Sequence, residues 1–229
     1  MKLAVMTWYH YHNYGTALQA AAMQAVLRDM GHEPQLIQYR PCGYFRTLPD
    51  YSISEFGRRI RIKLMRTSKP EPCGLKSELR DRAFDSFLER NIKFTEPCRT
   101  LSDLELLNDK FDAFICGSDQ VWSPLAYDPH YYLNFVHDNA KKIAYAPSMG
   151  AKEIRDRYIK ADISHLLDGF GALSAREDSG ARLICGLTGR HVEVVAGPTL
   201  LFDAERWEKI CCADEDRTAR YLLVYMLGN

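Results

Sequence analysis

Residues 111–122 read Phe-Asp-Ala-Phe-Ile-Cys-Gly-Ser-Asp-Gln-Val-Trp and form the most informative stretch of this sequence. An apolar run at 113–116 ends abruptly in a polar segment, which Val121 and Trp122 follow. This pattern predicts a buried strand that delivers a polar loop at its carboxyl end, with an aromatic plug behind the loop. In open α/β sheets, ligands bind at such strand ends. Packing alone would not call for Ser118, Asp119 and Gln120 in succession, so the stretch predicts both an α/β fold and a site.

Apolar segments with strand character alternate with helical segments on both sides of this stretch. Strands are expected at 2–8, 35–39, 113–116, 142–145, 171–175 and 191–196, and helices at 16–29, 101–108, 154–168, 179–185 and near 207. Thr16 is expected to cap the first helix and Gly31 to end it. The opening strand-loop-helix-strand unit is of a kind that is almost always parallel and right-handed. The sequence therefore predicts a Rossmann-like parallel sheet with helices on both faces.

Residues 41–100 differ in character from the rest of the chain. Apolar residues at helical spacing predict one helix across 53–64, and a second amphipathic helix runs from Leu75 toward Asn91, after the breaks at Pro70 and Pro72. We interpret about 41–110 as a helical insertion in a domain that spans 1–219. The first of these helices carries a basic face that either touches an anionic membrane or acceptor or is simply solvated, and it consists of Arg58, Arg59, Arg61, Lys63 and Arg66.

Composition and charge narrow the classes of partner. The chain has 229 residues, 46% of them hydrophobic, so it can bury a substantial core. Lys and Arg together number 30, as do Asp and Glu, and this balance argues against a nucleic-acid partner. The sequence shows neither a secretory signal nor a segment of membrane-spanning length. We therefore expect a cytoplasmic location. Peripheral association with the inner face of the membrane is a second location that we consider.

Seven cysteines are present, an odd number without any C-x-x-C pair, which is typical of reduced cytosolic thiols rather than of disulfides or a zinc site. His10 and His12 lack a third ligand at a diagnostic spacing, so no metal is expected and these histidines are assigned to the flank of a polar pocket. Residues 221–227 resemble a new buried strand. We interpret 220–229 as the first strand of a second domain that this sequence does not contain.

Polar or small residues follow four expected strands in succession. After the first strand, Asn13, Gly15 and Thr16 either bind an anion at the helix amino terminus or only form a turn and a cap. Ser148 lies in a similar cluster after the strand at 142–145. Arg176 follows the strand at 171–175, where it either forks onto a carboxylate or phosphate or pairs with a neighbouring acid. Because carboxyl ends of parallel strands share one edge, we expect these groups to meet in one crevice.

Five segments of the sequence together resemble the polysaccharide pyruvyl transferase family. They occur in the same order as in the family and extend over nearly the whole chain. Two departures are Pro147, where a small residue is usual, and Gly197, where an Asp commonly precedes Pro-Thr. The segments that carry the resemblance are 13–20 (NYGTALQA), 117–122 (GSDQVW), 142–150 (KIAYAPSMG), 174–177 (SARE) and 197–201 (GPTLL).

The resemblance implies the amino-terminal half of a two-domain glycosyltransferase B-like fold. It also implies transfer of the enolpyruvyl unit of phosphoenolpyruvate to two hydroxyls of a sugar or lipid-linked glycan, without a cofactor, as in the synthesis of cell-surface polysaccharides. Asp119 and Arg176 are then expected to be catalytic, as base or acceptor anchor and as donor-binding group. The expected substrate-binding residues are Asn13, Gly15, Thr16, Ser118, Gln120 and Ser148. Family members place further donor-binding groups in the second domain, so residues 1–229 alone are expected to be inactive.

Two other functions remain open from the sequence. A nucleotide-sugar glycosyltransferase shares the same architecture, since fold does not fix function. A non-catalytic sugar- or anion-binding module is the second alternative.

Overall fold

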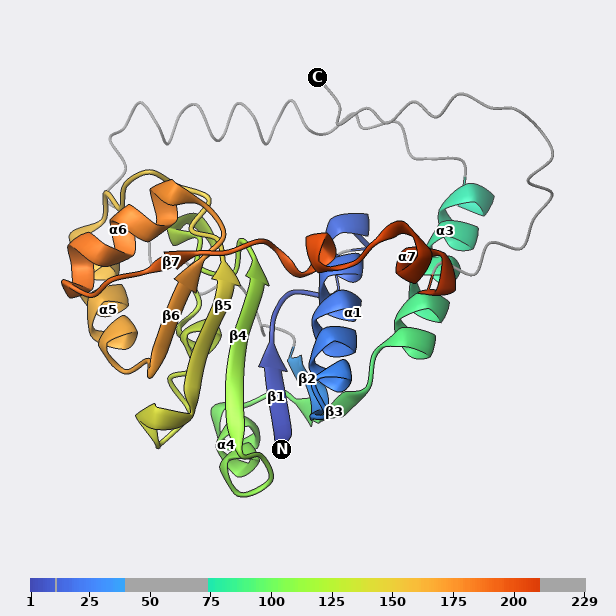
Figure 1. Cartoon of the computed structure of the whole chain (residues 1–229), viewed down its shortest axis with the longest axis horizontal. Helices are drawn as coiled ribbons and strands as arrows, with labels where there is room; N and C mark the ends of the chain where they lie inside the picture. Colours follow the sequence, from blue (N-terminus) through green and yellow to red (C-terminus); the bar gives the residue numbers. More distant parts are fainter. Residues whose placement is uncertain (11, 40–73, 211–229) are drawn as a thin grey trace.

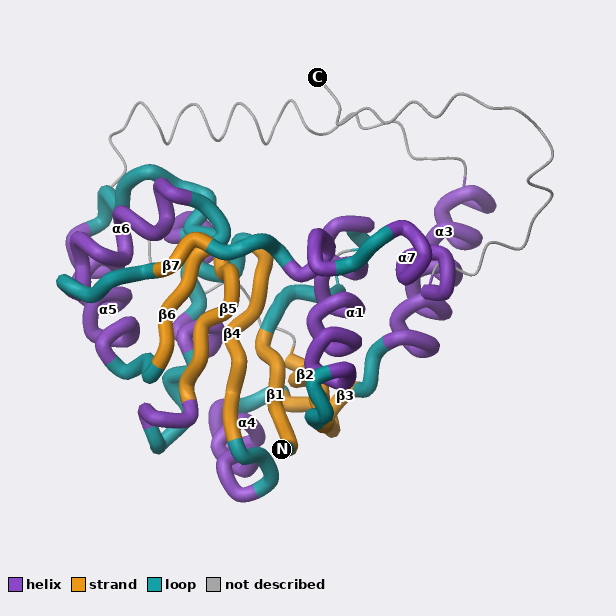
Figure 2. The backbone as a smooth tube through the Cα atoms, viewed as in Figure 1, coloured by secondary structure: helices purple, strands orange, loops and turns teal. Residues whose placement is uncertain are grey.

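The computed structural model describes residues 1–10, 12–39 and 74–210, and in this part of the chain helices flank a seven-stranded sheet (Figure 1). All pairings are parallel. The strand order is β3-β2-β1-β4-β5-β6-β7, and the strands lie side by side in Figure 2. The strands are β1 (Lys2–Met6), β2 (Glu33–Tyr39), β3 (Phe94–Cys98), β4 (Ala113–Asp119), β5 (Lys142–Pro147), β6 (Ala172–Ala175) and β7 (Glu193–Val194). The predicted α/β fold with a parallel sheet is confirmed.

The strand order reverses direction between β1 and β4. After β1 the chain builds β2 and β3 on one side, then returns to place β4 and the later strands on the other side. Loops that leave β1 and β4 therefore diverge, and this is the point of a doubly wound sheet at which ligands bind.

Helices cover both faces of the sheet, and the period-two alternation of the strands explains why. Val5 and Ile115 face α1 and α3, whereas Met6 and Phe114 face α4, α5 and α6. The α-helices are α1 (Tyr14–Asp29), α3 (Gly74–Asn91), α4 (Leu101–Glu105), α5 (Arg157–Asp168), α6 (Asp178–Thr188) and α7 (Ala204–Ile210). Figure 1 shows α5 and α6 on one side of the sheet and α1, α3 and α7 on the other.

Helix α1 is covered on two sides, which accounts for its alanine-rich sequence. Ala17, Ala20 and Ala21 pack toward the sheet, while Ala22 and Ala25 pack against Phe202 and the adjacent Trp207. Small side chains let the sheet and the 198–210 segment both approach the helix closely. The segment comprises the 3-10 helix η6 (Pro198–Leu201) and α7.

Trp122 lies at the centre of the larger core, as the sequence predicts. It is fully buried, stacks on Tyr132 with ring centroids 5.1 Å apart, and donates its indole N–H to the carbonyl of Tyr131 at 3.1 Å. The Tyr132 hydroxyl returns a hydrogen bond to the Trp122 carbonyl at 3.1 Å. The chain after β4 is thereby fixed to the core, so the polar segment before Trp122 has a rigid support.

Three local expectations need correction. Asn13, not Thr16, caps α1: the Asn13 side chain accepts a hydrogen bond from the Thr16 backbone N–H, because an N-cap oxygen must reach forward to an unpaired amide of the first turn. β4 continues through Asp119, so Ser118 belongs to the strand and not to a loop. β3 lies inside the segment interpreted as a helical insertion, where it pairs with β2 as an edge strand that tolerates Pro97.

The helix expected from Leu75 toward Asn91 is present as α3, the crossover between β2 and β3. The helix predicted at 53–64, the basic face at 58–66 and the strand predicted at 221–227 lie outside the described residues.

Candidate functional site

The carboxyl edge of the sheet brings the four predicted polar clusters together. The Thr16 hydroxyl donates to Asp119 Oδ2 at 2.8 Å, the Ser148 amide donates to the Asp119 carbonyl at 2.8 Å, and the Arg176 amide donates to the Pro147 carbonyl at 3.3 Å. These contacts connect α1, β4, β5 and the end of β6 in a continuous chain. The expectation that Asp119 and Arg176 share one edge of the sheet is confirmed by the parallel topology.

The turn before α1 is held by Asn13. Its Oδ1 accepts the Thr16 N–H at 3.1 Å, and a Cβ at Gly15 would lie only 3.3 Å from that oxygen. Glycine therefore allows the cap to close tightly. Asn13 and Gly15 are exposed at the edge, and the structure shows the capping role for Asn13 directly.

Gln19 is a buried residue of this region that the sequence reasoning missed. Its amide nitrogen donates to Thr7 Oγ1 at 3.0 Å, to the Trp8 carbonyl at 3.0 Å and to the Thr16 carbonyl at 3.1 Å. The Thr7 hydroxyl in turn donates to the Ser118 carbonyl at 3.2 Å. Gln19 thus ties the end of β1 to the first turn of α1, next to the strand that carries Asp119. The available signal was a glutamine within an otherwise apolar, alanine-rich part of the helix, a feature that Gln19 shares with Gln24.

Asp119 ends β4 in an unusual backbone conformation. Its φ is +146°, and its carboxylate accepts hydrogen bonds from the Thr16 hydroxyl and from the Gln120 amide at 2.8 Å. His12 and Ala146 also have positive φ, at +45° and +52°. These non-glycine residues follow or end β1, β4 and β5 at the same edge. Such conformations cost about 1–3 kcal/mol each and cluster at functional sites.

Ser118 and Gln120 flank Asp119 in different environments. Ser118 is only 1% exposed, and a Cβ at Gly197 would lie 3.5 Å from its hydroxyl oxygen, so Gly197 is its cover. Gln120 is exposed, and a Cβ at Gly150 would come within 3.1 Å of the Gln120 side chain. Gly150, at φ +57°, therefore permits the close approach of Gln120.

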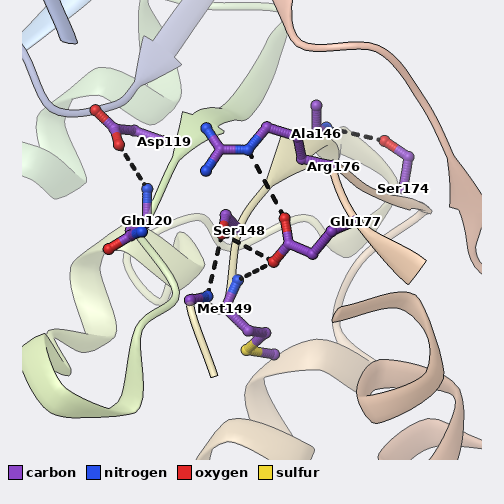
Figure 3. A network of polar contacts seen from close by, with 9 residues as sticks. Asp119, Gln120, Ala146, Ser148, Met149, Ser174, Arg176 and Glu177 are labelled. Atoms are coloured by element: carbon purple, nitrogen blue, oxygen red, sulfur yellow. Dashed lines mark hydrogen bonds and ion pairs between the residues drawn. The ribbon is translucent and has the colours of Figure 1, made fainter. Parts of the chain in front are cut away.

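Glu177 is the centre of a network that the sequence reasoning did not identify (Figure 3). Its Oε1 accepts hydrogen bonds from the Ser148 hydroxyl at 2.8 Å and from the Met149 amide at 3.2 Å. Its Oε2 lies 3.7 Å from Arg176 Nε. The Ser148 hydroxyl also accepts the Gly150 amide at 3.1 Å. Ser148 is 2% exposed, and its hydroxyl serves contacts within the protein.

Arg176 presents the unpaired part of its side chain at this edge. Among the described residues, the pairing with Glu177 uses Nε, and neither terminal guanidinium nitrogen has a hydrogen-bond or ion-pair partner. The side chain is 37% exposed. In Figure 3 the guanidinium points from the end of β6 toward the side on which Asp119 and Gln120 lie. The expected pairing with a neighbouring acid is present, but it leaves the forked end of the side chain available.

The ends of β5 and β6 are joined by a side chain where the backbone ladder breaks. The Ser174 hydroxyl donates to the Ala144 carbonyl at 2.8 Å and accepts the Ala146 amide at 3.0 Å, which offsets the left-handed turn at Ala146. The Tyr145 hydroxyl donates to the Ala196 carbonyl at 3.0 Å and so fixes the segment before Gly197. Burial raises the pKa of Tyr145, which keeps that hydroxyl a donor.

His12 binds acids rather than a metal-ligand set. Its Nδ1 lies 2.9 Å from Asp81 and its Nε2 lies 3.3 Å from Asp85, both on α3, and its ring stacks on Phe84. Within 1–10, 12–39 and 74–210, no group of three or more His, Cys, Asp or Glu residues is arranged to hold a metal ion. No helix in the same ranges is long and apolar enough to cross a membrane.

Two surface cavities lie away from the carboxyl edge. One is at the amino ends of the strands, near Lys2, Asp112 and Lys141, and the other lies between α1 and α7, near Arg28 and Lys209. Neither includes a residue of the predicted site.

Comparison with known proteins agrees with the resemblance seen in the sequence. The sequence model of one family, described as polysaccharide pyruvyl transferase, matches residues 13–226 and so covers nearly the whole chain. No curated protein and no solved structure matches the chain.

Proposed function

The chain belongs to the polysaccharide pyruvyl transferase family, and we propose that it transfers pyruvate from phosphoenolpyruvate to a sugar of a cell-surface glycan as a cyclic ketal. A proton adds to the methylene carbon of the donor, one sugar hydroxyl attacks the resulting oxocarbenium-like carbon, and a second hydroxyl replaces the phosphate. Over the whole reaction, the number of protons lost by the two hydroxyls equals the number gained: one proton by the new methyl group and one by the departing phosphate.

This reaction makes three demands on a site. The protein must hold a donor with a phosphate and a carboxylate, orient two neighbouring hydroxyls, and move protons to and from the reacting groups. Arginine suits the first demand because its planar fork makes paired hydrogen bonds to phosphate or carboxylate oxygens.

One observation carries the proposal: the forked end of Arg176 has no hydrogen-bond or ion-pair partner among the described residues, and it lies at the same sheet edge as Asp119. Within the described ranges Glu177 contacts Arg176 through Nε and neither terminal nitrogen has a protein partner, which leaves the forked end for a ligand. In the proposed site Arg176 binds the phosphate or carboxylate of the donor, and Asp119 accepts a proton from, or anchors, an acceptor hydroxyl.

The other predicted site residues divide by accessibility. Asn13, Gly15 and Gln120 are exposed at the edge and are proposed to meet the sugar. Thr16, Ser118 and Ser148 are buried, so we propose that Thr16 and Ser148 act by holding Asp119 and the loop after β5. Ser118 lies beneath Gly197, so we propose that it supports the end of β4 next to Asp119.

A second candidate is glycosyl transfer from a nucleotide-sugar. The strand order seen here is also that of dinucleotide-binding sheets, in which the ligand lies at the β1–β4 switch point. A binding module without catalysis is the third reading. The proposed acceptor is a sugar or lipid-linked glycan at the cytoplasmic face of the membrane, with peripheral membrane contact as part of that proposal.

The test uses the full-length protein with phosphoenolpyruvate and oligosaccharide acceptors, and it measures phosphate release together with the mass of the acceptor. Stoichiometric phosphate and a pyruvylated acceptor support the proposal. Release of a nucleoside diphosphate from nucleotide-sugars, with phosphoenolpyruvate inert, would instead support the glycosyltransferase. Donor binding by calorimetry without turnover on any acceptor would support the binding module.

A further inference from the structure

The Glu177 carboxylate accepts two hydrogen bonds from the loop after β5 and forms an ion pair with Arg176. One oxygen binds the Ser148 hydroxyl and the Met149 amide of the loop after β5, and the other faces Arg176 Nε (Figure 3). Glu177 is the backbone N-cap of α6, but its side chain makes no capping hydrogen bond to that helix. The side chain therefore serves the neighbouring strand ends instead of its own helix.

These contacts divide the Arg176 guanidinium into a held part and an open part. Nε faces Glu177, so the side of the plane that carries Nε is directed at the protein. The two terminal nitrogens have no partner in the described part of the chain, so they remain for a ligand with two oxygens in one plane, such as a carboxylate or a phosphate. A protein carboxylate bound to the terminal nitrogens would prevent a ligand from binding them. Glu177 faces Nε instead and therefore does not compete with such a ligand.

Comparison with another close Arg–Glu pair of the chain shows the difference. Arg155 and Glu153 lie on the surface, where their side chains are 79% and 65% exposed. The side chains of Arg176 and Glu177 are 37% and 31% exposed, and Glu177 is fixed by two hydrogen bonds independently of the arginine. Exposed ion pairs contribute little to stability because both side chains lose conformational freedom when the pair forms. In this pair the hydrogen bonds from Ser148 and Met149 already restrict the Glu177 side chain.

We infer that Glu177 is a positioning residue, which sets the orientation of Arg176 and the loop at Ser148 and Met149 so that the open edge of the guanidinium receives an oxyanion of the donor. This inference rests on the proposed function for the identity of the donor. Glu177 itself does not touch the donor, since its negative charge would repel it.

The sign of the effect separates positioning from simple electrostatics. Glu177→Gln removes a negative charge near an anionic ligand, and this change by itself would tighten donor binding. Loss of positioning acts in the opposite direction, because Arg176 then samples orientations that do not face the donor. We expect Glu177→Gln to raise the KM for phosphoenolpyruvate about three- to tenfold, with a smaller change in kcat.

The experiment is a double-mutant cycle of Glu177→Gln with Arg176→Ala, with Glu153→Gln as the matched control. KM, kcat and the calorimetric Kd for phosphoenolpyruvate are measured for each full-length variant, and the melting temperature reports folding. If Glu177 acts through Arg176, Glu177→Gln weakens donor binding in the wild type and has no further effect in Arg176→Ala. The control should leave the constants unchanged.

Each outcome decides between the inference and the proposed function. A lowered or unchanged Kd in Glu177→Gln, or an equal effect in the presence and absence of Arg176, overturns the positioning role. Wild-type protein that binds phosphoenolpyruvate without turnover leaves the cycle measurable by Kd, so the inference stands while the proposed reaction fails. Wild-type protein that neither binds nor turns over the donor overturns both.

Discussion

The Thr16 hydroxyl donates a hydrogen bond to Asp119 Oδ2 at 2.8 Å, across 103 positions of sequence. The contact joins the first turn of α1 to the carboxyl end of β4, at the point where the sheet reverses direction. One oxygen of Asp119 is thereby fixed by the first βα unit and the other by the Gln120 amide. The carboxylate has a set orientation before any ligand arrives.

Thr16→Val removes this hydroxyl while keeping the shape of the side chain. The backbone N–H that Asn13 caps is unchanged, so the effect reports the bond to Asp119. We expect the free energy of unfolding to fall by about 1–2 kcal/mol, because the site is buried at Thr16 but only half-buried at Asp119. Urea unfolding measures it. Thr188→Val is the control, because the Thr188 hydroxyl makes its hydrogen bonds at the end of α6, away from Asp119. Equal stability of Thr16→Val and wild type would contradict the prediction.

Arg176→Lys and Arg176→Ala are both expected to impair use of the donor, with Lys restoring only part of the loss. An ammonium keeps the charge but cannot make the paired hydrogen bonds of the fork. Loss of a charge-assisted contact costs about 1.5–3 kcal/mol, or roughly ten- to a hundredfold in kcat/KM. Steady-state kinetics with phosphoenolpyruvate measures the effect, and the melting temperature is the control for folding. Normal turnover by Arg176→Ala would exclude Arg176 from the site.

Gly197→Ala tests whether a ligand uses the space between Ser118 and Arg176. The new Cβ would lie 3.5 Å from Ser118 Oγ and 3.7 Å from Arg176 Cδ, at ordinary contact distances, and the backbone at φ −63° and ψ 152° suits alanine. The variant should therefore fold normally. We expect the KM for the donor to rise about tenfold, since a methyl group occupies space that the ligand needs.

Gly186→Ala is the matched control for this variant, because a Cβ there meets no heavy atom within 4 Å. It should leave the KM unchanged and, as a helical position, stabilise the protein slightly. A KM for Gly197→Ala equal to that of wild type would show that no ligand group enters this space.

The thiols of Cys116 and Cys185 should differ in reactivity in the native protein. Burial holds the pKa of Cys116 far above its ordinary value, so at pH 8 it carries almost no thiolate, and its side chain is also inaccessible. Cys185 is exposed on α6. Iodoacetamide followed by peptide mapping should modify Cys185 in the native state and Cys116 only after denaturation; rapid native labelling of Cys116 would contradict its place in the core.

Local signals predicted most of the described elements but not their ends. The run at 113–116 correctly indicated a buried strand, because continuous apolar residues are needed where both faces of a sheet are covered. The strand continues through Asp119 because its backbone pairs with Pro147, a contact that side-chain polarity does not reveal. β3 was missed because Glu96 and Pro97, its two exposed positions, interrupt the apolar pattern. Only its pairing with β2 identifies it as a strand.

The candidate site was foreseeable in its members but not in its connections. Polar residues after successive strands pointed to Asp119, Ser148 and Arg176. Glu177 looked like a local partner of Arg176, since neighbouring opposite charges are common on protein surfaces. Its contacts with Ser148 and Met149 depend on β5 and β6 lying side by side.

The sequence by itself determined the class of fold, the succession of strands and helices, and the family, because apolar periodicity and short motifs are local properties of the chain. Only the tertiary structure decided which groups meet. The parallel pairing of β1 with β4 sets Thr16 against Asp119, and the pairing of β5 with β6 sets Glu177 between Ser148 and Arg176. Hydrogen bonds and ion pairs act over a few ångströms, so their partners follow from strand order and register rather than from separation in the sequence.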